Sequence, residues 1–367
     1  MRARISGLFI RAALSSMVGA FRTSGRTRAL VMLVVVVAAL TLPATALPAT
    51  ALPATALTGV ASAAPNAAAP VDPMSDEALV RSLAGGFSNG YATVNGTRLH
   101  YVIGGKGTPL VLLGGWPQTW WQYHKIMPAL AEHHRVIAVD LRGMGGSDKP
   151  AGGYDKKTMA NDIYELVRHL GYRKVDIAGH DIGSKVAFSF AANHPDATRK
   201  VAMLDVLHPD ESYYQYKLLP PSGWQTPPPY YLWWFAFNQV RGLPERLVSG
   251  RSRYLIDWLV NYGAKNRSAI TDRDRAVYAR AYNYPDAIRA SNGWYQTFGQ
   301  DIVDQRAYGK LTAPILGLGG SLGYPSLRAL LPTKGTDVRV VRVANSGHFI
   351  AEEQPDAVIS YLNQFFA

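Results

Sequence analysis

The sequence predicts an α/β protein: a doubly wound, mostly parallel sheet of eight strands, with a helical segment inserted after the sixth strand. Two observations predict this class. Short apolar runs bounded by turn residues alternate with helical stretches along the chain. The alternation stops once, after residue 207, and resumes about 100 residues later with further apolar runs and a last helix. In such a sheet, functional residues gather at the carboxyl ends of the strands.

The first two strands, 91–94 and 97–103, are expected to pair antiparallel, because Asn95-Gly96 between them is a strong signal for a tight hairpin. Mainly apolar runs, typical of strands buried on both faces of a parallel sheet, predict the rest. They lie at 110–113, 136–139, 175–178, 201–204, 314–318 and 338–343. The clearest helices of the core are expected at 158–170, 184–192 and 355–366.

The inserted segment, 208–307, is expected to be mainly helical. Residues 254–262 keep close to a helical period, and Thr271 with Asp274 predicts a capping box at the start of another helix. Aromatic residues are concentrated in this segment. Most of them are expected to pack in the interior, with one or two facing a cavity.

Residues 1–63 are expected to be a signal peptide and low-complexity leader. Every charged residue before Ala64 is an arginine, the apolar run 29–40 suits a signal-peptide core, and L-P-A-T-A then occurs three times. We expect cleavage after Ala63 and a mature chain that is secreted or associated with the cell envelope, with 64–86 as an N-terminal extension. An uncleaved signal anchor is the alternative.

Composition excludes several classes of protein. Without the six leader arginines, 32 basic residues face 26 acidic ones, so the net charge of the mature chain is +6. No basic run interleaved with aromatics occurs, so nucleic-acid binding is not expected. Zero cysteine rules out disulfides, a thiolate nucleophile and cysteine zinc sites. We expect no metal, no cofactor and no stable membrane span in the mature chain, and the oligomeric state stays open.

The motif that carries chemistry is Gly179-His180-Asp181-Ile182-Gly183, between a predicted buried strand and a helix. G-x-nucleophile-x-G on such a turn is a nucleophile elbow, whose glycines allow close approach of the backbone. Aspartate in that position favours displacement at saturated carbon, which gives an alkyl ester, because its attack on an ordinary ester would give only an anhydride. A helix N-cap is the alternative role for Asp181.

Hydrolysis of that alkyl ester needs a base that activates water and amide donors for the oxyanion. Of nine histidines, His348 alone lies late in the chain, between the last strand and the final helix, and it is the candidate base. A histidine on a surface loop is the alternative. The backbone N–H groups of Trp116 and Ile182 are expected to form the oxyanion hole, and Trp116-Pro117 is a candidate cis bond. The loop 140–148 is expected to be structural despite its carboxylates.

Together these motifs resemble the α/β-hydrolase-fold epoxide hydrolases and their haloalkane and haloacetate dehalogenase relatives, over 87–367. G-G-W-P-Q-T-W-W at 114–121 is similar to the family's H-G-x-P loop, with Gly114 in place of the histidine. D-L-R-G-M-G-G-S-D, G-H-D-I-G and S-G-H-F also fit. The resemblance implies a hydrolase core at 87–207 and 308–367, a helical cap at 208–307, and hydrolysis of an epoxide to a vicinal diol.

The resemblance also implies the remaining site residues. In many relatives the acid that orients the histidine follows the strand near Leu318, where this chain has no carboxylate, so the role falls on Asp205, the other position known in the family. An aspartate that caps the strand end is the alternative. N-G-W-Y-Q at 292–296 is similar to the segment with the ring-opening tyrosine, here Tyr295. The second donor position matches Trp234, whose indole N–H is a poor acid. Expected substrate contacts are Trp116, Trp233 and Trp234.

Two other functions stay open. Trp234 keeps a hydrolytic dehalogenase in consideration, although Ile182 and Lys185 replace the arginines that bind carboxylate in the haloacetate type, and haloalkane types have tryptophan at the position of Ile182. An exported protein that binds a small molecule without turnover is the third possibility. The presence of Asp181, His348, Asp205 and Tyr295 together argues against it. The aromatic cap suggests an apolar small-molecule substrate.

Overall fold

The computed structural model describes residues 72–216 and 231–367. The predicted leader, 1–63, lies outside these ranges. In the two described ranges, the helices are too short or too polar to cross a bilayer. The described part of the N-terminal extension contains α1 (Asp76–Arg81), which begins after Ser75 because the Ser75 hydroxyl accepts a hydrogen bond from the Ala78 backbone N–H.

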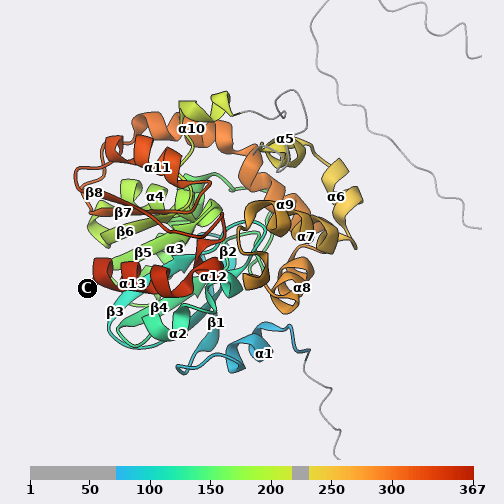
Figure 1. Cartoon of the computed structure of the whole chain (residues 1–367), viewed down its shortest axis with the longest axis horizontal. Helices are drawn as coiled ribbons and strands as arrows, with labels where there is room; N and C mark the ends of the chain where they lie inside the picture. Colours follow the sequence, from blue (N-terminus) through green and yellow to red (C-terminus); the bar gives the residue numbers. More distant parts are fainter. Residues whose placement is uncertain (1–71, 217–230) are drawn as a thin grey trace, which may run out of the picture. The chain divides into compact units, whose positions relative to one another are not determined.

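Eight strands form one sheet in the order β1-β2-β4-β3-β5-β6-β7-β8 (Figure 1). They are β1 (Ser88–Val94), β2 (Thr97–Gly104), β3 (Thr108–Leu113), β4 (His134–Val139), β5 (Val175–His180), β6 (Thr198–Leu204), β7 (Ile315–Gly319) and β8 (Val338–Arg342). β2 is antiparallel to both β1 and β4, and the pairs from β4 through β8 are parallel. Asn95 and Gly96 take positive φ angles of 45° and 71° in the β1–β2 turn. The predicted fold class is confirmed.

Side chains alternate between two buried layers, one on each face of the sheet. Val111 and Leu113 belong to one apolar cluster, whereas Leu110 and Leu112 belong to the other. Helices α3 (Lys156–His169) and α4 (Ile182–Asn193) pack in the first cluster, and α13 (Pro355–Phe366) packs in the second. The sheet is therefore covered on both faces, as in a doubly wound fold.

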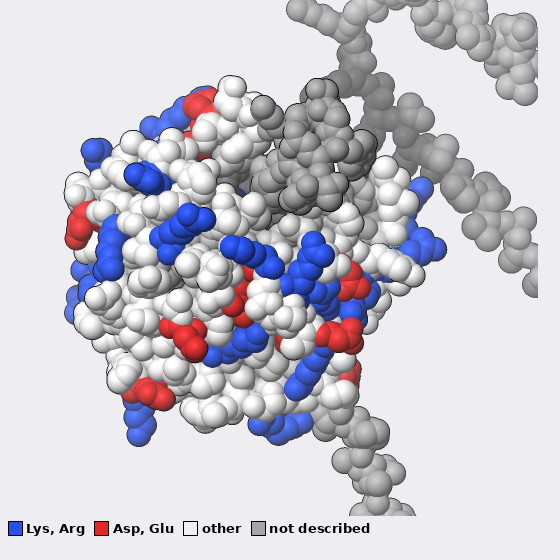
Figure 2. Space-filling view, viewed as in Figure 1, with Lys and Arg blue, Asp and Glu red and all other residues white. Residues whose placement is uncertain are grey.

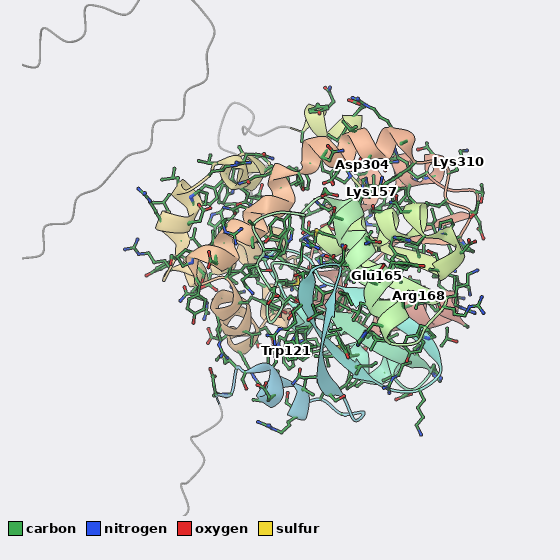
Figure 3. The ribbon with its side chains drawn as sticks, turned by 180° about the vertical axis from the view of Figure 1, so that it is seen from behind. Trp121, Lys157, Glu165, Arg168, Asp304 and Lys310 are labelled. Carbon is green, nitrogen blue, oxygen red and sulfur yellow. The ribbon has the colours of Figure 1, made fainter. Side chains whose placement is uncertain are left out.

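The amphipathic sequence of α3 shows how these helices attach. Its apolar residues Met159, Ile163 and Leu166 are fully buried at helical spacing. The charged residues Lys157, Glu165 and Arg168 lie along its outer side (Figure 3). Further short core elements are η1 (Trp120–Tyr123), α2 (Met127–Leu130), η2 (Pro195–Ala197), α11 (Tyr324–Leu330), η5 (Leu331–Thr333) and α12 (Ile350–Glu353).

The segment between β6 and β7 is helical, and its helices α5 to α9 gather on one side of the sheet (Figure 1). Its elements are η3 (Glu211–Gln215), α5 (Trp233–Gln239), α6 (Leu243–Val248), α7 (Ser252–Gly263), η4 (Arg267–Ala269), α8 (Asp272–Ala281), α9 (Pro285–Gln296) and α10 (Phe298–Ala307). The predicted capping box of Thr271 and Asp274 is present at the start of α8. On the face drawn in Figure 2, basic side chains are scattered with acidic ones among them.

Candidate active site

A pocket of about 370 Å³ lies between the carboxyl ends of the strands and the inserted helices. The core contributes charged and polar side chains to its wall, namely Asp181, Lys185, Asp205 and His348, and also Trp116. The inserted segment contributes mainly aromatic ones, namely Tyr213, Tyr216, Trp234, Phe235, Tyr262 and Tyr295. The structure thus brings the four predicted catalytic residues to one cavity.

Asp181 lies between β5 and α4, with a strained backbone of φ 48° and ψ −113°. The turn is possible because Gly179 and Gly183 lack side chains: a Cβ on either would lie 2.1 Å from a backbone oxygen. Within the described residues, the Asp181 carboxylate makes no capping bond to α4. Its Oδ1 instead accepts a hydrogen bond of 3.0 Å from the Trp116 backbone N–H. These contacts rule against the helix-cap alternative.

The loop after β3 contributes Trp116 and Pro117 to the pocket wall and lies directly against the elbow. A Cβ on Gly115 would lie 2.5 Å from the Asp181 Cβ, so glycine lets this loop approach the carboxylate. The Trp116-Pro117 bond is cis, as predicted. The Trp116 N–H, predicted as an oxyanion donor, lies against the Asp181 carboxylate, and Ile182 is the buried first residue of α4.

His348 lies between β8 and α12, and its Nδ1 is 2.7 Å from Asp205 Oδ2. The other oxygen of Asp205 accepts hydrogen bonds from the backbone N–H groups of Gly320 and Gly323, at 2.8 and 3.2 Å. The loop after β7, which has no carboxylate of its own, therefore fixes the Asp205 side chain. This pairing does not fit the two alternatives, in which His348 is a histidine on a surface loop and Asp205 only caps the end of its strand.

The protonation of the site follows from burial and these contacts. Burial alone would raise the pKa of Asp181, but the Lys185 ammonium and the His348 imidazole outweigh it and hold that pKa below its ordinary value. Burial opposes protonation of His348, yet the hydrogen bond that its Nδ1–H donates to Asp205 raises its pKa above the ordinary value. Burial lowers the pKa of neighbouring His180 to about 3, so His180 is neutral.

Neutral His180 supports the backbone of the candidate base and stays outside the pocket wall. Its Nε2 is 2.8 Å from the backbone oxygen of His348, and its Nδ1 is 3.3 Å from Gln122 Oε1. The backbone N–H of His348 in turn donates to the oxygen of Gly263 at the end of α7, over 2.8 Å. The position of His348 thus depends on both the core and the inserted segment.

Two of the three predicted cap contacts line the pocket. Tyr295 on α9 is 1% exposed, and its ring packs edge-on against Trp116 with centroids 5.4 Å apart. Trp234 on α5 also lines the wall. The structure places Trp233 outside the pocket wall, which corrects its predicted substrate contact. Successive helical residues point about 100° apart, and it is Trp234 that reaches the wall. The Trp233 ring packs instead on Trp258 and Phe237.

Several pocket residues were not predicted from the sequence. For Lys185 a signal exists, because a residue four positions after Asp181 lies on the same face of α4. Tyr213, Tyr216 and Phe235 carry no such signal, since their place in the wall depends on how the inserted helices pack. The loop 140–148 has the structural role predicted for it: Asp140 accepts hydrogen bonds from the Trp120 and Gly146 backbones and pairs with His100 at 2.8 Å.

Two side-chain groups have potential metal-ligand atoms within 4.8 Å of one another, and both lie outside the pocket wall. One consists of Asp76, His100 and Asp140, and the other of His124, Asp274 and Glu352. Their carboxylates already accept hydrogen bonds, for example from the indole N–H groups of Trp120 and Trp121. These contacts explain both groups as supporting structure.

The buried Glu352 connects three parts of the molecule. Its carboxyl oxygens are bonded to the side chains of Gln118, from the loop after β3, and Tyr278, on α8. The hydroxyl of Tyr282, the residue directly after α8, donates to the Gln118 backbone oxygen over 2.7 Å. Burial raises the pKa of Glu352 from 4.5 to about 8, so the folded protein holds a protonated carboxyl group here at neutral pH.

Replacing Glu352 with glutamine is expected to flatten the dependence of stability on pH. Between the ordinary pKa of 4.5 and about 8, the folded wild type binds one proton that the unfolded chain does not. Its free energy of unfolding should therefore fall as pH rises through this range, by about 1 kcal/mol per pH unit from this group. Glutamine has nearly the shape of the protonated glutamate side chain but cannot ionise, so Glu352→Gln removes the pH dependence that this group contributes. Denaturant unfolding at pH 5 to 8 measures this, and parallel wild-type and variant curves would contradict it.

The strand order, the elbow aspartate and the histidine and acid pair are the features of an α/β-hydrolase. A family model described as alpha/beta hydrolase fold matches residues 108–248. The chain is 38% identical over 289 residues to the soluble epoxide hydrolase of Corynebacterium sp. (strain C12), covering 75% of this chain and 96% of that protein. The chain belongs to the α/β-hydrolase family and is an enzyme of that family.

The chain is also similar to a solved epoxide hydrolase structure and to a dehalogenase. The solved structure of the epoxide hydrolase CorEH without ligand has 36% identity and a TM-score of 0.67, covering 77% of this chain and 99% of that one. The fluoroacetate dehalogenase of Burkholderia sp. is 28% identical over 295 residues, covering 77% of this chain and 94% of that protein. Epoxide hydrolases and a dehalogenase are thus both among its relatives.

Proposed function

We propose that this hydrolase opens an apolar epoxide to a vicinal diol through a transient alkyl ester on Asp181. In this mechanism Asp181 is the nucleophile, His348 the base, Asp205 the residue that orients the base, and Tyr295 the proton donor to the opened ring. The observation that carries the proposal is the Asp181 carboxylate itself: ionised, held at the elbow in a strained backbone, and facing the same pocket as the His348 and Asp205 pair.

In the first step one oxygen of Asp181 attacks a ring carbon, and the C–O bond opposite breaks. The oxygen that is released carries a negative charge and needs a proton, which a phenol can supply. Tyr295 fits this role because α9 contributes it to the wall of the pocket that also holds Asp181. Trp234 offers an indole N–H on the same wall, which can donate a hydrogen bond but is a poor acid.

In the second step His348 removes a proton from water, and the hydroxide attacks the carboxyl carbon of Asp181. The charge that develops on Oδ1 is stabilised by the Trp116 N–H, which already donates to that atom over 3.0 Å, and we assign the N–H of Ile182 as the second donor. Asp205 holds the proton of His348 on Nδ1, so that Nε2 is free to accept the proton of water.

Hydrolytic dehalogenation is the second candidate function. It is favoured by the tryptophan in the pocket wall and by the relationship to a fluoroacetate dehalogenase. A halide leaves without a proton and needs only hydrogen-bond donors around it, so Trp234 would suffice there. The epoxide proposal ranks first because the relative with 38% identity is an epoxide hydrolase.

A panel of terminal and aromatic epoxides and matched haloalkanes, scored for diol and halide, tests the proposal. Diol is expected to form faster than halide on substrates of similar size. A single turnover in ¹⁸O-water should give diol whose new oxygen is ¹⁶O, because that atom comes from Asp181. Halide release without diol would select the second function. If neither product forms and the intact mass of the protein does not change, the protein binds a small molecule without turning it over.

A further inference from the structure

Lys185 is a buried cation in the pocket wall that the proposed mechanism does not yet use. Its side chain is 1% exposed, and its Nζ lies 3.5 Å from Asp181 Oδ2 and 5.5 Å from the centre of the Phe298 ring. Burying an ammonium group is unfavourable, because the charge loses its solvation by water. Its location beside the nucleophile therefore calls for a chemical explanation.

The contacts of Asp181 distinguish its two oxygens. Oδ1 accepts the hydrogen bond from the Trp116 N–H, which makes it the atom that carries the oxyanion charge. Oδ2, beside Lys185, is then the oxygen that bonds to the substrate carbon. In the ester, Oδ1 is the carbonyl oxygen and Oδ2 joins the enzyme to the substrate.

We propose that Lys185 is the general acid that protonates Oδ2 as it leaves Asp181 during hydrolysis of the ester. This inference rests on the proposed function. Attack of hydroxide on the carboxyl carbon gives a tetrahedral intermediate with its charge on Oδ1. When the carbonyl re-forms, the bond from the carboxyl carbon to Oδ2 breaks, and the electron pair goes to Oδ2. The Lys185 ammonium supplies the proton that turns this alkoxide into the second hydroxyl group of the diol.

The proton balance of the hydrolysis step closes through the site and the solvent. Collapse of the intermediate leaves Asp181 as a carboxylic acid and Lys185 as a neutral amine 3.5 Å apart in the resting geometry. The acid returns its proton to the amine, which restores the ion pair. His348, which holds the proton taken from water, releases it to solvent. The sum is one ester and one water giving one diol, one carboxylate and one proton, and this proton replaces the one that Tyr295 gave up during ring opening.

Lys185 is not placed to serve the ring-opening step. In displacement at carbon the breaking bond lies opposite the forming one, so the released oxygen emerges on the side away from Oδ2 and Lys185. We assign the proton for that oxygen to Tyr295, which α9 contributes to the same pocket wall. The two proton donors are therefore divided between the two steps, Tyr295 for ring opening and Lys185 for ester cleavage.

The pKa of the Lys185 ammonium is expected to be lowest in the alkyl-ester intermediate, which is the state in which a general acid is required. Burial lowers the pKa of the Lys185 ammonium, and the Asp181 carboxylate partly opposes this effect. Esterification cancels the charge of Asp181, so the pKa falls further in the intermediate. The nearby Lys156 acts in the same direction, although it is itself paired with Asp301 at 2.7 Å. Loss of a proton to the leaving oxygen then removes an unpaired buried charge.

The test separates formation of the ester from its hydrolysis by rapid quench and intact-mass measurement, above pH 7. Lys185→Met is expected to form the ester within about threefold of the wild-type rate and to hydrolyse it about 10²-fold more slowly, the size typical of general acid catalysis. Lys185→Arg keeps the charge but is too weak an acid, so it should also accumulate ester. Lys157→Met, the same change on the exposed face of α3 (Figure 3), should behave as wild type.

A series of epoxides with electron-withdrawing substituents gives the decisive readout. Such substituents make the leaving alcohol more acidic, so the hydrolysis defect of Lys185→Met and Lys185→Arg should shrink along the series. A defect of equal size for every alcohol, or hydrolysis at the wild-type rate in both variants, overturns the role of Lys185. Failure of the proposed function itself looks different, because then the wild type would form neither ester nor diol.

Discussion

His348→Gln is expected to be alkylated once by an epoxide and then to remain alkylated. Its intact mass should rise by the mass of the epoxide, and its steady-state turnover should fall by about 10⁴-fold or more, the scale seen when a catalytic base is removed. Intact-mass measurement followed by peptide mapping to Asp181 tests both parts. This single variant tests the central claim of the mechanism, that two residues act on two different steps.

The physical reason lies in the different demands of the two steps. Alkylation needs an ionised Asp181, whose pKa lies below its ordinary value because Lys185 and His348 outweigh the effect of burial. Hydrolysis needs the neutral imidazole of His348, whose pKa is raised by Asp205. Wild-type hydrolysis should therefore decline as pH falls through this raised pKa, above the ordinary value of about 6.5, while alkylation continues.

A matched control is His169→Gln, the same substitution on the exposed end of α3, which should keep wild-type turnover. Asp181→Asn treated with the same epoxide should gain no mass. Diol formation by His348→Gln at the wild-type rate, or an adduct mapped to a residue other than Asp181, would refute the assignment of the base or of the nucleophile.

How far the site can be predicted depends on which part of the fold supplies a residue. Asp181, Asp205 and His348 follow three strands of one parallel sheet, whose carboxyl ends must lie along one edge. Their convergence therefore follows from the strand pattern together with the family resemblance. The close approach of the backbone at Gly179 and Gly183 also follows from the sequence, because the elbow motif requires glycine at both positions.

The strand pattern does not determine which residues of the inserted helices line the pocket. Trp233 and Trp234 are adjacent and chemically identical, yet only a helix rotation that sequence does not specify puts Trp234 in the pocket wall and Trp233 against Trp258. Glu352 shows the same limit. Its pattern is that of an ordinary first-turn acid, and its burial at 1% exposure depends on the packing of α8 against the loop after β3.

Asp205→Asn is expected to reduce turnover by about 10⁴-fold without unfolding the protein, because the change reverses a single hydrogen bond. The amide oxygen of the variant side chain can still accept from the N–H groups of Gly320 and Gly323, as Asp205 Oδ1 does at 2.8 and 3.2 Å. The amide nitrogen, however, donates to His348 Nδ1, which forces the imidazole proton onto Nε2. That nitrogen can then no longer accept a proton from water, so the variant should accumulate the alkyl ester.

Stability and pH dependence separate this explanation from a general loss of structure. The melting temperature of Asp205→Asn should stay near that of the wild type, whereas Asp205→Ala, which leaves both glycine N–H groups without their acceptor, should melt lower. Without the carboxylate, burial dominates and the pKa of His348 falls, so the residual hydrolysis should persist to lower pH than in the wild type. Wild-type turnover by Asp205→Asn would mean that another group orients His348, and it would remove the need for an anion at this position.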